Sequence, residues 1–417
     1  MKRNVLLVFT CVTLLLLTAI CLFGCSGKPA SVYQNPNSYL SLHADGRKIV
    51  NEKGEEVRLR GTNAGSYLVQ ESWMNPTSSS CHRVTVKTLT ERFGYEKMRA
   101  LYDVYETAWW TEQDFDNVKS IGFNVIRLPF SYLNLTVDPD EPSDYYQKGF
   151  DRIRWFVDEC AKRELYVILD LHGAIGSQSG YDHSGDTRYE LYSTPRYMDA
   201  TVALWEKIAS LYVGNKTVAG YDLLNEPLNK KGEGTSGKVQ WNFYDRLYKA
   251  IRKIDPDHII FIEGMWSVNA LPMPYDYGWE NVVYEFHNYQ WAGSDSPVVQ
   301  TQSAEKKVTS YKKFNVPVLI GEFNAFSEEK SWIGVLNAYE NGGCNWTTWS
   351  YKMCTDYEDK TNSWGLYCGT LPKIDPKNDS YERIEEIWGK TSTAETCCLN
   401  EKLAPLLRNY TGATEAA

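Results

Sequence analysis

Two glutamates stand at the ends of separate apolar runs, and together they suggest acid–base and nucleophilic chemistry. Glu226 lies in an Asn-Glu-Pro triplet that ends the run 218–227, and Glu322 lies in a Gly-Glu-Phe triplet that ends the run 317–323. Two carboxyl groups about 5–5.5 Å apart can cleave a glycosidic bond with retention of configuration, one as general acid and base and the other as nucleophile. The sequence therefore predicts Glu226 as the acid/base and Glu322 as the nucleophile.

Other polar and aromatic residues at the ends of apolar runs could support such a pair. An Asn could donate to a sugar 2-hydroxyl, while an Arg and a Tyr could hold the nucleophile ionised. Histidines could bind hydroxyls and tune the acid/base, and a Trp could form a floor beneath the sugar. Each has an ordinary explanation as an ion-paired or core residue, but apolar side chains would stabilise those positions at lower desolvation cost. The predicted supporting set is Arg127, His172, Asn225, His287, Tyr289 and Trp349.

Eight short apolar runs recur along the chain, with helical patterns between them. Nearly continuous hydrophobicity indicates strands buried on both faces, and alternation with helices indicates βαβ units. An open doubly wound sheet is the alternative, but no Gly-x-Gly-x-x-Gly turn follows the first strand. The sequence thus predicts an α/β chain that forms a single-domain (β/α)8 TIM barrel. The expected strands are 56–64, 124–130, 166–172, 218–227, 258–264, 282–289, 317–323 and 344–351.

In such a barrel the carboxyl ends of the strands meet at one rim, where active sites lie. Long segments at 68–119, 173–195 and 354–379 are expected to extend this rim, the first as a loop and a helix. Glu263 could face the cleft or support another residue, and Asp170 is expected to pair with a buried cation. About half of a set of tryptophans should offer stacking platforms for flanking sugars: Trp109, Trp110, Trp266, Trp291 and Trp364.

The N-terminus has the features of a targeting segment. A basic start is followed by an almost entirely apolar stretch, Val5 to Leu22, and by a cysteine, Cys25, at a boundary similar to a bacterial lipobox. We expect a lipoprotein signal peptide at 1–24, lipid attachment at Cys25, a tether at 25–44, the catalytic domain at 45–410 and a flexible tail at 411–417. A plain signal peptide or an uncleaved anchor is the alternative. Each of these alternatives predicts an exported protein.

The composition limits the classes of partner that we expect the protein to bind. The formal net charge of −9 disfavours nucleic acid and anionic membrane as partners but is compatible with a neutral polysaccharide. The expected contact with a membrane is through the N-terminal lipid only, and the chain is expected to be monomeric. No paired metal-ligand spacing is present, and we expect no metal or cofactor. Seven cysteines follow Cys25, and a bond between Cys354 and Cys368 is one possible pairing.

The constellation resembles glycoside hydrolase family 5, whose barrel has its acid/base in an Asn-Glu-Pro motif at strand four and its nucleophile at strand seven. Residues 61–73 and 170–178 further resemble the exo-β-1,3-glucanase and glucosylceramidase-like branch of that family. The branch resemblance implies that Glu71 contacts the glucose at the cleavage site. Tyr67 and Ile175 depart from the branch pattern, which expects Trp and Pro there, so linkage and exo or endo action stay open.

The resulting hypothesis is a retaining β-glycoside hydrolase that acts on β-1,3 or mixed-linkage glucan or on β-glucosides. An endo-β-1,4-glucanase or a β-mannanase on the same scaffold is the first alternative. A surface glycan-binding lipoprotein that has lost catalysis is the second, but it would need no nucleophile held by a Tyr and an Arg. A structural envelope protein would leave the polar strand ends unexplained.

Overall fold

A computed structural model describes residues 40–228, 237–326 and 328–413 of the chain. The expected signal peptide, Cys25 and most of the tether lie outside the described residues. Strand β1 begins at Leu42, inside the segment expected to be tether, and helix α14 includes Thr411, the first residue of the expected tail. Among the described helices, none combines the length and the hydropathy that a membrane crossing requires.

Eight parallel strands close into a barrel, which confirms the predicted fold. The strands follow one another around the barrel in chain order, with β12 pairing back onto β3. Each predicted run contains one of these strands. They are β3 (Arg60–Asn63), β4 (Val125–Ser131), β7 (Tyr166–Gly173), β8 (Val218–Asp222), β9 (Ile259–Glu263), β10 (Val282–Tyr289), β11 (Val318–Asn324) and β12 (Asn345–Thr348).

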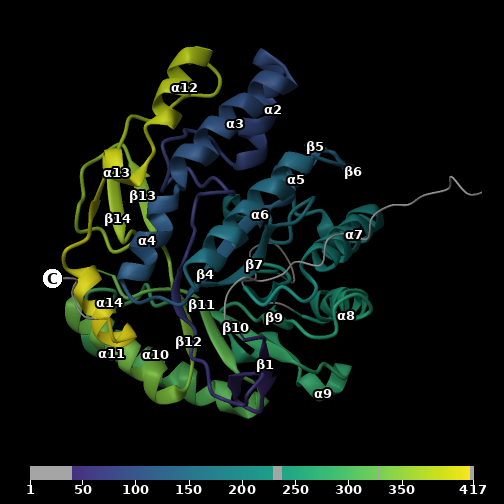
Figure 1. Ribbon diagram of the computed structural model, residues 1–417, viewed down its shortest axis with the longest axis vertical. Coiled ribbons are helices and arrows are strands. Elements are labelled where there is room, and N and C mark those ends of the chain that lie inside the picture. Colours follow the sequence, from purple (N-terminus) through teal and green to yellow (C-terminus); the bar gives the residue numbers. More distant parts are fainter. Residues whose placement is uncertain (1–39, 229–236, 327, 414–417) are drawn as a thin grey trace, which may run out of the picture. The chain divides into compact units, whose positions relative to one another are not determined.

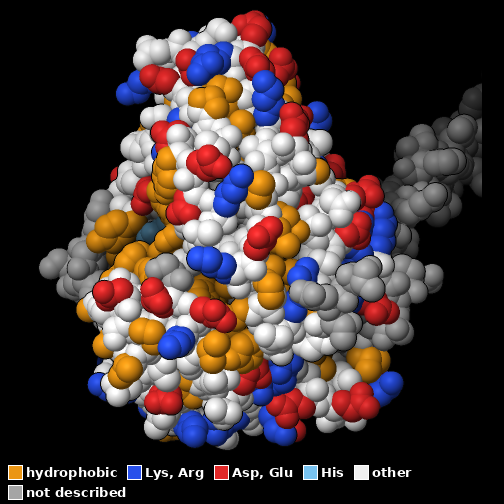
Figure 2. All heavy atoms as spheres, turned by 90° about the vertical axis from the view of Figure 1, so that its left-hand side faces the viewer, with side chains coloured by type: hydrophobic (Ala, Val, Ile, Leu, Met, Phe, Trp, Pro, Cys, Tyr) orange, Lys and Arg blue, Asp and Glu red, His pale blue; other side chains and the backbone are white. Residues whose placement is uncertain are grey.

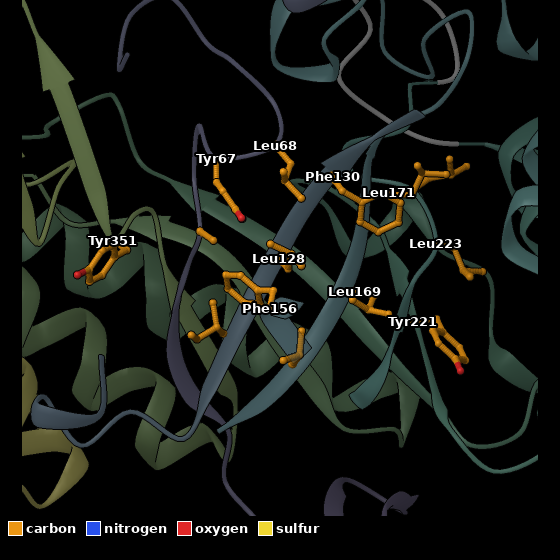
Figure 3. Packing of buried hydrophobic residues seen from close by; sticks show 14 of the residues in the cluster. Tyr67, Leu68, Leu128, Phe130, Phe156, Leu169, Leu171, Tyr221, Leu223 and Tyr351 are labelled. Atoms are coloured by element: carbon orange, nitrogen blue, oxygen red, sulfur yellow. The ribbon is translucent and has the colours of Figure 1, made fainter. Parts of the chain in front are cut away.

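Alternate residues of each strand point into the barrel or out toward the helices, as the two-residue period of a strand requires. Leu128 and Phe130 of β4 and Leu169 and Leu171 of β7 belong to the outer core (Figure 3). The inward positions change along the barrel axis from apolar to charged. An apolar layer near the amino ends of the strands includes Val125, Ile168, Ile259, Phe261, Val283 and Leu319. The charged layer above it includes Arg127, Asp170, Glu263 and Glu285, all fully buried.

Helices surround the barrel, with α7 and α8 at the right of Figure 1 and α10 and α11 at its lower left. The segments whose spacing predicts helices, 146–165, 198–212, 244–254, 304–314, 333–339 and 381–388, all contain helical residues. The main surrounding helices are α6 (Gln147–Lys162), α7 (Pro195–Tyr212), α8 (Lys238–Arg252), α10 (Pro297–Tyr311), α11 (Glu329–Gly342), α12 (Tyr381–Gly389) and α14 (Leu403–Thr411). Shorter elements are α5 (Tyr132–Leu135), β5 (Thr136–Asp138), β6 (Glu141–Tyr145), α9 (Pro274–Tyr277) and α13 (Thr393–Thr396).

A hairpin closes the amino end of the barrel. Strands β1 (Leu42–Asp45) and β2 (Lys48–Asn51) pair antiparallel around a two-residue turn. Leu42 and Ile49 belong to the same apolar cluster as the inward residues of that end. The barrel interior is therefore sealed below the charged layer, and the opposite end is left for the site.

The segment after β3 is more helical than the predicted loop and helix. It contains α2 (His82–Phe93), α3 (Tyr95–Trp109) and α4 (Glu112–Ser120). Trp109 and Trp110, considered above as sugar platforms, are 0% and 1% exposed and pack in the outer core. Amphipathic spacing along α3 explains this, because a Trp at the buried edge of a helix gains more from the core than from solvent.

The segment after β12 adds a small sheet rather than a plain loop. Strands β13 (Lys352–Thr355), β14 (Tyr367–Thr370) and β15 (Cys397–Leu399) form it. The Sγ atom of Cys354 lies 3.8 Å from that of Cys397, and Gly369 stands between them in the sheet register. Cys397 is therefore the cysteine that approaches Cys354, rather than the Cys368 considered above, because β14 places Cys368 on the other face.

Charged side chains of both signs are interspersed over the coloured part of the face in Figure 2. Hydrophobic side chains occur between them in small groups. No broad basic area occupies the coloured part of this face.

Candidate active site

A cavity of about 720 Å³ opens at the carboxyl ends of the barrel strands. Its lining comes from the ends of β7, β10 and β11 and from the segments that follow β3, β7, β8, β9, β10 and β12. The lining residues are Glu71, Trp73, His172, Tyr181, Asp182, His183, Asn225, Glu226, Leu228, Met265, Trp266, Tyr289, Trp291, Glu322, Trp349 and Trp364. Of the predicted site residues, Arg127 and His287 lie behind this surface and contact the two glutamates.

Glu226 is held in the cavity by both its backbone and its side chain. Its φ of +44° lies in the left-handed region, which a glutamate occupies only when its surroundings hold it there. The Glu226 N–H donates to Oε2 of Glu263 at 2.5 Å. Oε1 of Glu226 lies 2.7 Å from Nδ1 of His287, and Oε2 lies 3.3 Å from Nε2 of His183. Glu263 thus supports Glu226 instead of lining the cavity.

Glu322 is held by three neighbours. Nη1 of Arg127 donates to its Oε1 at 3.0 Å, and the hydroxyl of Tyr289 donates to its Oε2 at 2.8 Å. Nδ1 of His287 lies 3.4 Å from the same Oε2. The contacts predicted for Arg127 and Tyr289 are therefore present.

The two glutamates are close enough to act on one bond. One imidazole nitrogen of His287 lies within 3.4 Å of both carboxylates, so their nearer oxygens lie within about 6 Å of each other. Retaining glycosidases place their carboxyl groups about 5–5.5 Å apart, whereas inverting enzymes need about 6.5–9.5 Å to admit a water molecule. The upper bound of about 6 Å lies below the range of inverting enzymes, which favours a covalent intermediate.

Arg127 organises the charged layer beneath the cavity. Its guanidinium contacts Asp170 at 3.1 Å, Asp222 at 2.8 Å and Glu285 at 3.2 Å, in addition to Glu322. The ion pair that we expected for Asp170 is thus formed. Pairing with several carboxylates offsets the desolvation of a fully buried cation.

Arg127 also determines which way the Asn225 amide faces. Nη2 of Arg127 lies 2.9 Å from Oδ1 of Asn225. A guanidinium can only donate hydrogen bonds, so the amide oxygen must face it and the NH2 group must turn away. Since Asn225 lines the cavity, its NH2 can donate to a sugar hydroxyl there.

The protonation of the two glutamates depends on shared neighbours. Burial raises the pKa of Glu322, against the opposing effect of His287 and Arg127. Burial has the same effect on Glu226, but His183 and the hydrogen bond to His287 prevail and lower its pKa. Burial disfavours charge on His287, yet Glu263, Glu322 and Glu226 raise its pKa well above the usual range. The contact between Glu226 and His287 therefore favours the ionised form of the carboxyl group and the protonated form of the imidazole.

The floor and the far wall of the cavity also contain predicted residues. The rings of His172 and Trp349 stack at 5.5 Å with an interplanar angle of 10°, and Nδ1 of His172 lies 2.7 Å from Asp170. Glu71 accepts a hydrogen bond from the Trp73 indole at 2.9 Å, while its Oε1 has no partner. Burial raises the pKa of Glu71 to about 8, so its carboxyl group is neutral at pH 7 and can both donate and accept.

Tryptophans line the mouth of the cavity. Trp266, Trp291 and Trp364 line it as predicted, and Trp73 joins them. Trp291 and Trp364 stack at 5.6 Å, and Trp73 meets Trp364 edge-on at 5.3 Å. These rings are exposed enough to receive the apolar faces of sugar rings.

The sequence reasoning missed Tyr181, Asp182 and His183, which line the cavity from the segment after β7. That segment was expected to extend the rim, but these three residues were not singled out. Their position in the sequence could have identified them, because polar and aromatic residues in a loop that follows a barrel strand lie at the rim that holds the site.

One compact set of potential metal ligands occurs among the residues that the structure describes. The ligand atoms of Glu226, Glu263 and His287 lie within 4.8 Å of one another. His287 and the backbone of Glu226 already bond within this set. The geometry is therefore explained by mutual hydrogen bonds that orient Glu226.

A (β/α)8 barrel with two facing glutamates and an aromatic-walled cavity at its carboxyl rim defines a glycosidase of the retaining type. The family described as Cellulase (glycosyl hydrolase family 5) matches residues 50–354. The chain belongs to glycosyl hydrolase family 5 and hydrolyses O-glycosyl bonds with retention of configuration.

Relatives and solved structures are similar over much of the chain. A β-xylosidase of Phanerodontia chrysosporium is 30% identical over 346 residues, covering 75% of this chain and 70% of the relative. A probable glucan 1,3-β-glucosidase A of Neosartorya fischeri is 28% identical over 274 residues, covering 64% and 65%. The latter match thus spans just under two thirds of the relative.

Two crystal structures show the same fold. An endogalactoceramidase aligns with a TM-score of 0.61 at 16% identity, over 88% of this chain and 84% of the other. A β-glucanase of Saccharophagus degradans aligns with a TM-score of 0.53 at 18% identity, over 78% and 90%.

Proposed function

We propose that this protein is a β-glucan-directed retaining hydrolase in which Glu322 is the nucleophile and Glu226 the acid/base. The observation that carries the roles is the unequal surroundings of the two carboxylates. Arg127 and Tyr289 both donate to Glu322, which orients its carboxylate as a nucleophile and opposes the effect of burial on its pKa. Glu226 instead lies 2.7 Å from Nδ1 of His287, which places a titratable group beside the residue that must give and take a proton.

In the first step Glu322 attacks the anomeric carbon and forms a covalent glycosyl-enzyme. Glu226 passes its proton to the leaving oxygen as the glycosidic bond breaks. The Asn225 NH2 group donates to the 2-hydroxyl, where a hydrogen bond strengthens in the transition state. Trp349 lies beneath the sugar, supported by its stack on His172.

In the second step a water molecule replaces the leaving group. Glu226, now ionised, removes a proton from that water, and the resulting hydroxide attacks the anomeric carbon. The bond to Glu322 breaks, Glu322 regains its negative charge, and the β configuration is restored. Glu226 thereby regains the proton that it gave to the leaving oxygen, and the site is ready for the next cycle.

The substrate class is supported by the relatives and by the cavity. Several curated relatives are glucan 1,3-β-glucosidases, and the first-strand segment with Glu71 resembles that branch. Glu71 and Asp182 add hydroxyl-binding groups to one wall, and the Trp cluster adds stacking faces. The β-xylosidase relative makes β-xylosides the comparison substrate to include.

The deciding experiment measures product release from laminarin, mixed-linkage glucan, soluble cellulose, mannan and aryl β-glucosides and β-xylosides. NMR spectroscopy of fresh product reports the anomer, and the Glu322→Gln variant is the control. Glucose with initially retained β configuration from β-1,3 substrates supports the proposal. Oligosaccharides from cellulose or mannan alone would overturn the substrate class, and α product would overturn the mechanism. If the protein binds a polysaccharide but cleaves none of the substrates, it is a capture protein instead.

We also propose that the protein is an exported, monomeric lipoprotein with Cys25 as its lipidated residue. The support is the apolar N-terminal stretch and the lipobox-like boundary. A mass measurement of the mature N-terminus tests it. A diacylglycerol-modified Cys25 supports lipidation, whereas an unmodified or differently cleaved terminus contradicts it.

A further inference from the structure

His183 occupies an unusual place beside Glu226. It lies in a short turn, Asp182–Ser184, that follows β7, and it lines the cavity. Its Nε2 atom is buried, has no hydrogen-bond partner and lies 3.3 Å from Oε2 of Glu226. A buried ring nitrogen without a partner costs free energy, so its place requires an explanation.

The free oxygen of Glu226 shows which side of the substrate His183 faces. His287 holds Oε1, so Oε2 is the oxygen left to meet the glycosidic bond. A general acid must lie within about 2.6–3.2 Å of the oxygen that it protonates. The leaving oxygen therefore lies next to Oε2, and the ring that carries this oxygen lies within reach of His183.

A rigid turn holds His183 in this position. The hydroxyl of Ser184 donates to the Asp186 carbonyl at 2.8 Å and contacts the Ser177 hydroxyl at 2.7 Å. Gly185 has a φ of +72°, and its N–H donates to the Asp182 carbonyl at 2.8 Å. The His183 ring also stacks on Tyr181 at 5.8 Å with an interplanar angle of 27°. The orientation thus exists before the substrate binds, which lowers the entropy cost of a contact.

We propose that His183 is a specificity-determining residue that binds a hydroxyl of the leaving sugar through Nε2. On a sugar leaving group, the ring hydroxyl next to the cleaved bond lies within hydrogen-bonding distance of the glycosidic oxygen. It can therefore approach both Nε2 of His183 and Oε2 of Glu226 from the cavity that these residues line. An aryl leaving group without a neighbouring hydroxyl leaves Nε2 unpaired, and the enzyme would then favour saccharides over simple aryl glycosides.

This inference rests on the proposed hydrolysis of β-glucosides, and the experiment separates the two. The catalytic efficiency, kcat/KM, is measured on two leaving groups with the same sugar at the cleavage site. One substrate is laminaritriose or cellotriose, whichever the unmodified enzyme cleaves faster, and the other is 4-nitrophenyl β-glucoside. If the unmodified enzyme cleaves none of them, the proposed function fails as well. If it cleaves them, the variants test His183 alone.

Two variants separate the ring stacking of the His183 imidazole from its hydrogen bonding. His183→Phe keeps an aromatic ring against Tyr181 but removes the donor, and His183→Gln restores a donor near Nε2. We expect His183→Phe to lower kcat/KM roughly tenfold or more for the trisaccharide but less than roughly threefold for the aryl glucoside. His183→Gln should recover a large part of the loss. The control His43→Phe alters an exposed histidine at the opposite end of the barrel and should change neither value.

Equal losses on both substrates would overturn the proposal, because His183 would then act on Glu226 or on the fold and not on the leaving sugar. Unchanged kinetics in His183→Phe would overturn it too. Thermal melting of each variant identifies unfolding, and a His183→Phe variant that fails to fold leaves His183→Gln and His183→Asn to decide. For these two variants, a loss of kcat/KM on the trisaccharide that is larger for Asn than for Gln supports the proposal. Equal losses of kcat/KM on the trisaccharide and on the aryl glucoside contradict it.

Discussion

Glu226 and His287 are joined by a contact of 2.7 Å between Oε1 and Nδ1. The same imidazole nitrogen lies 3.4 Å from Oε2 of Glu322, so one ring connects both carboxylates of the site. Groups this strongly coupled titrate as a set, and the apparent pKa values of a pH–rate profile belong to the set rather than to one residue. The ring also keeps the nearer oxygens of the two carboxylates within about 6 Å of each other, which is below the separation of inverting enzymes.

Azide rescue distinguishes the roles of the two glutamates. Glu226→Ala should lower kcat/KM about 10²–10⁴-fold on oligosaccharides, because protonation of the leaving oxygen is lost. A 2,4-dinitrophenyl glucoside should lose much less, since its leaving group needs no proton. Azide should restore turnover and yield β-glucosyl azide, whereas Glu322→Ala should yield the α anomer. Mass spectrometry and NMR spectroscopy of the products check this, and exchanged anomers would reverse the assignment.

Glu71 should make the protein less stable as the pH rises. Burial raises its pKa to about 8, against about 4.3 in an unfolded chain. Between these values the folded state binds the extra proton, so the free energy of unfolding falls by up to about 1.4 kcal/mol per pH unit. Glu71→Gln removes this pH-dependent contribution to the free energy of unfolding. Urea unfolding should show the variant gaining stability relative to the wild type between pH 5 and pH 8.

An exposed glutamate provides the control for that experiment. Glu96 lies on the exposed face of α3, outside the cavity lining, and Glu96→Gln is the matched glutamate-to-glutamine substitution. Parallel pH curves for wild type and Glu71→Gln would show that the Glu71 carboxyl is not neutral in the folded protein.

Gly321 is required beneath the nucleophile. A Cβ atom added there would lie 1.5 Å from Oε1 of Glu285, a carboxylate that contacts Arg127. Gly321→Ala should therefore lower the free energy of unfolding by about 1–3 kcal/mol or more, and it should disturb the Arg127 contacts that orient Glu322. Urea unfolding and kcat measure the two effects.

Gly389 offers a matched substitution in helix α12. An added Cβ would meet only Val104, at 3.5 Å, which is an ordinary contact. Gly389→Ala should change stability by less than about 1 kcal/mol and leave kcat unaltered. Similar losses in both alanine variants would indicate that the space at Gly321 is not limiting.

Trp291 should contribute to binding but not to the chemical step. It is 64% exposed, lines the cavity mouth and stacks on Trp364. Trp291→Ala should raise KM for longer oligosaccharides roughly tenfold, as expected for loss of one stacking contact, with little change in kcat. Tyr357→Ala, at an exposed tyrosine outside the cavity lining, is the control. A fall in kcat with unchanged KM would place Trp291 in the reaction instead.

Much of the site could be predicted from the chain because strand periodicity and barrel topology constrain it. Each polar strand end at a barrel rim must face the same opening, so Glu226, Glu322, Asn225 and Trp349 could be placed together before any coordinates. The contacts of Arg127 and Tyr289 with Glu322 followed from the same placement. The ion pair of Asp170 followed from the cost of an unpaired buried charge.

What only the tertiary structure decided concerns loops and distances between segments far apart in the sequence. The spacing along α3 gives Trp109 and Trp110 a buried side, but their partners, such as Phe156 and Tyr351 for Trp110, lie far away in the sequence. A turn held by hydrogen bonds of the Ser184 hydroxyl folds over the rim, and it brings Tyr181, Asp182 and His183 to the cavity. The sequence by itself determined the strands and their chemistry, since those depend on local alternation. The partner of each side chain depended on closure of the barrel, which joins residues up to hundreds of positions apart.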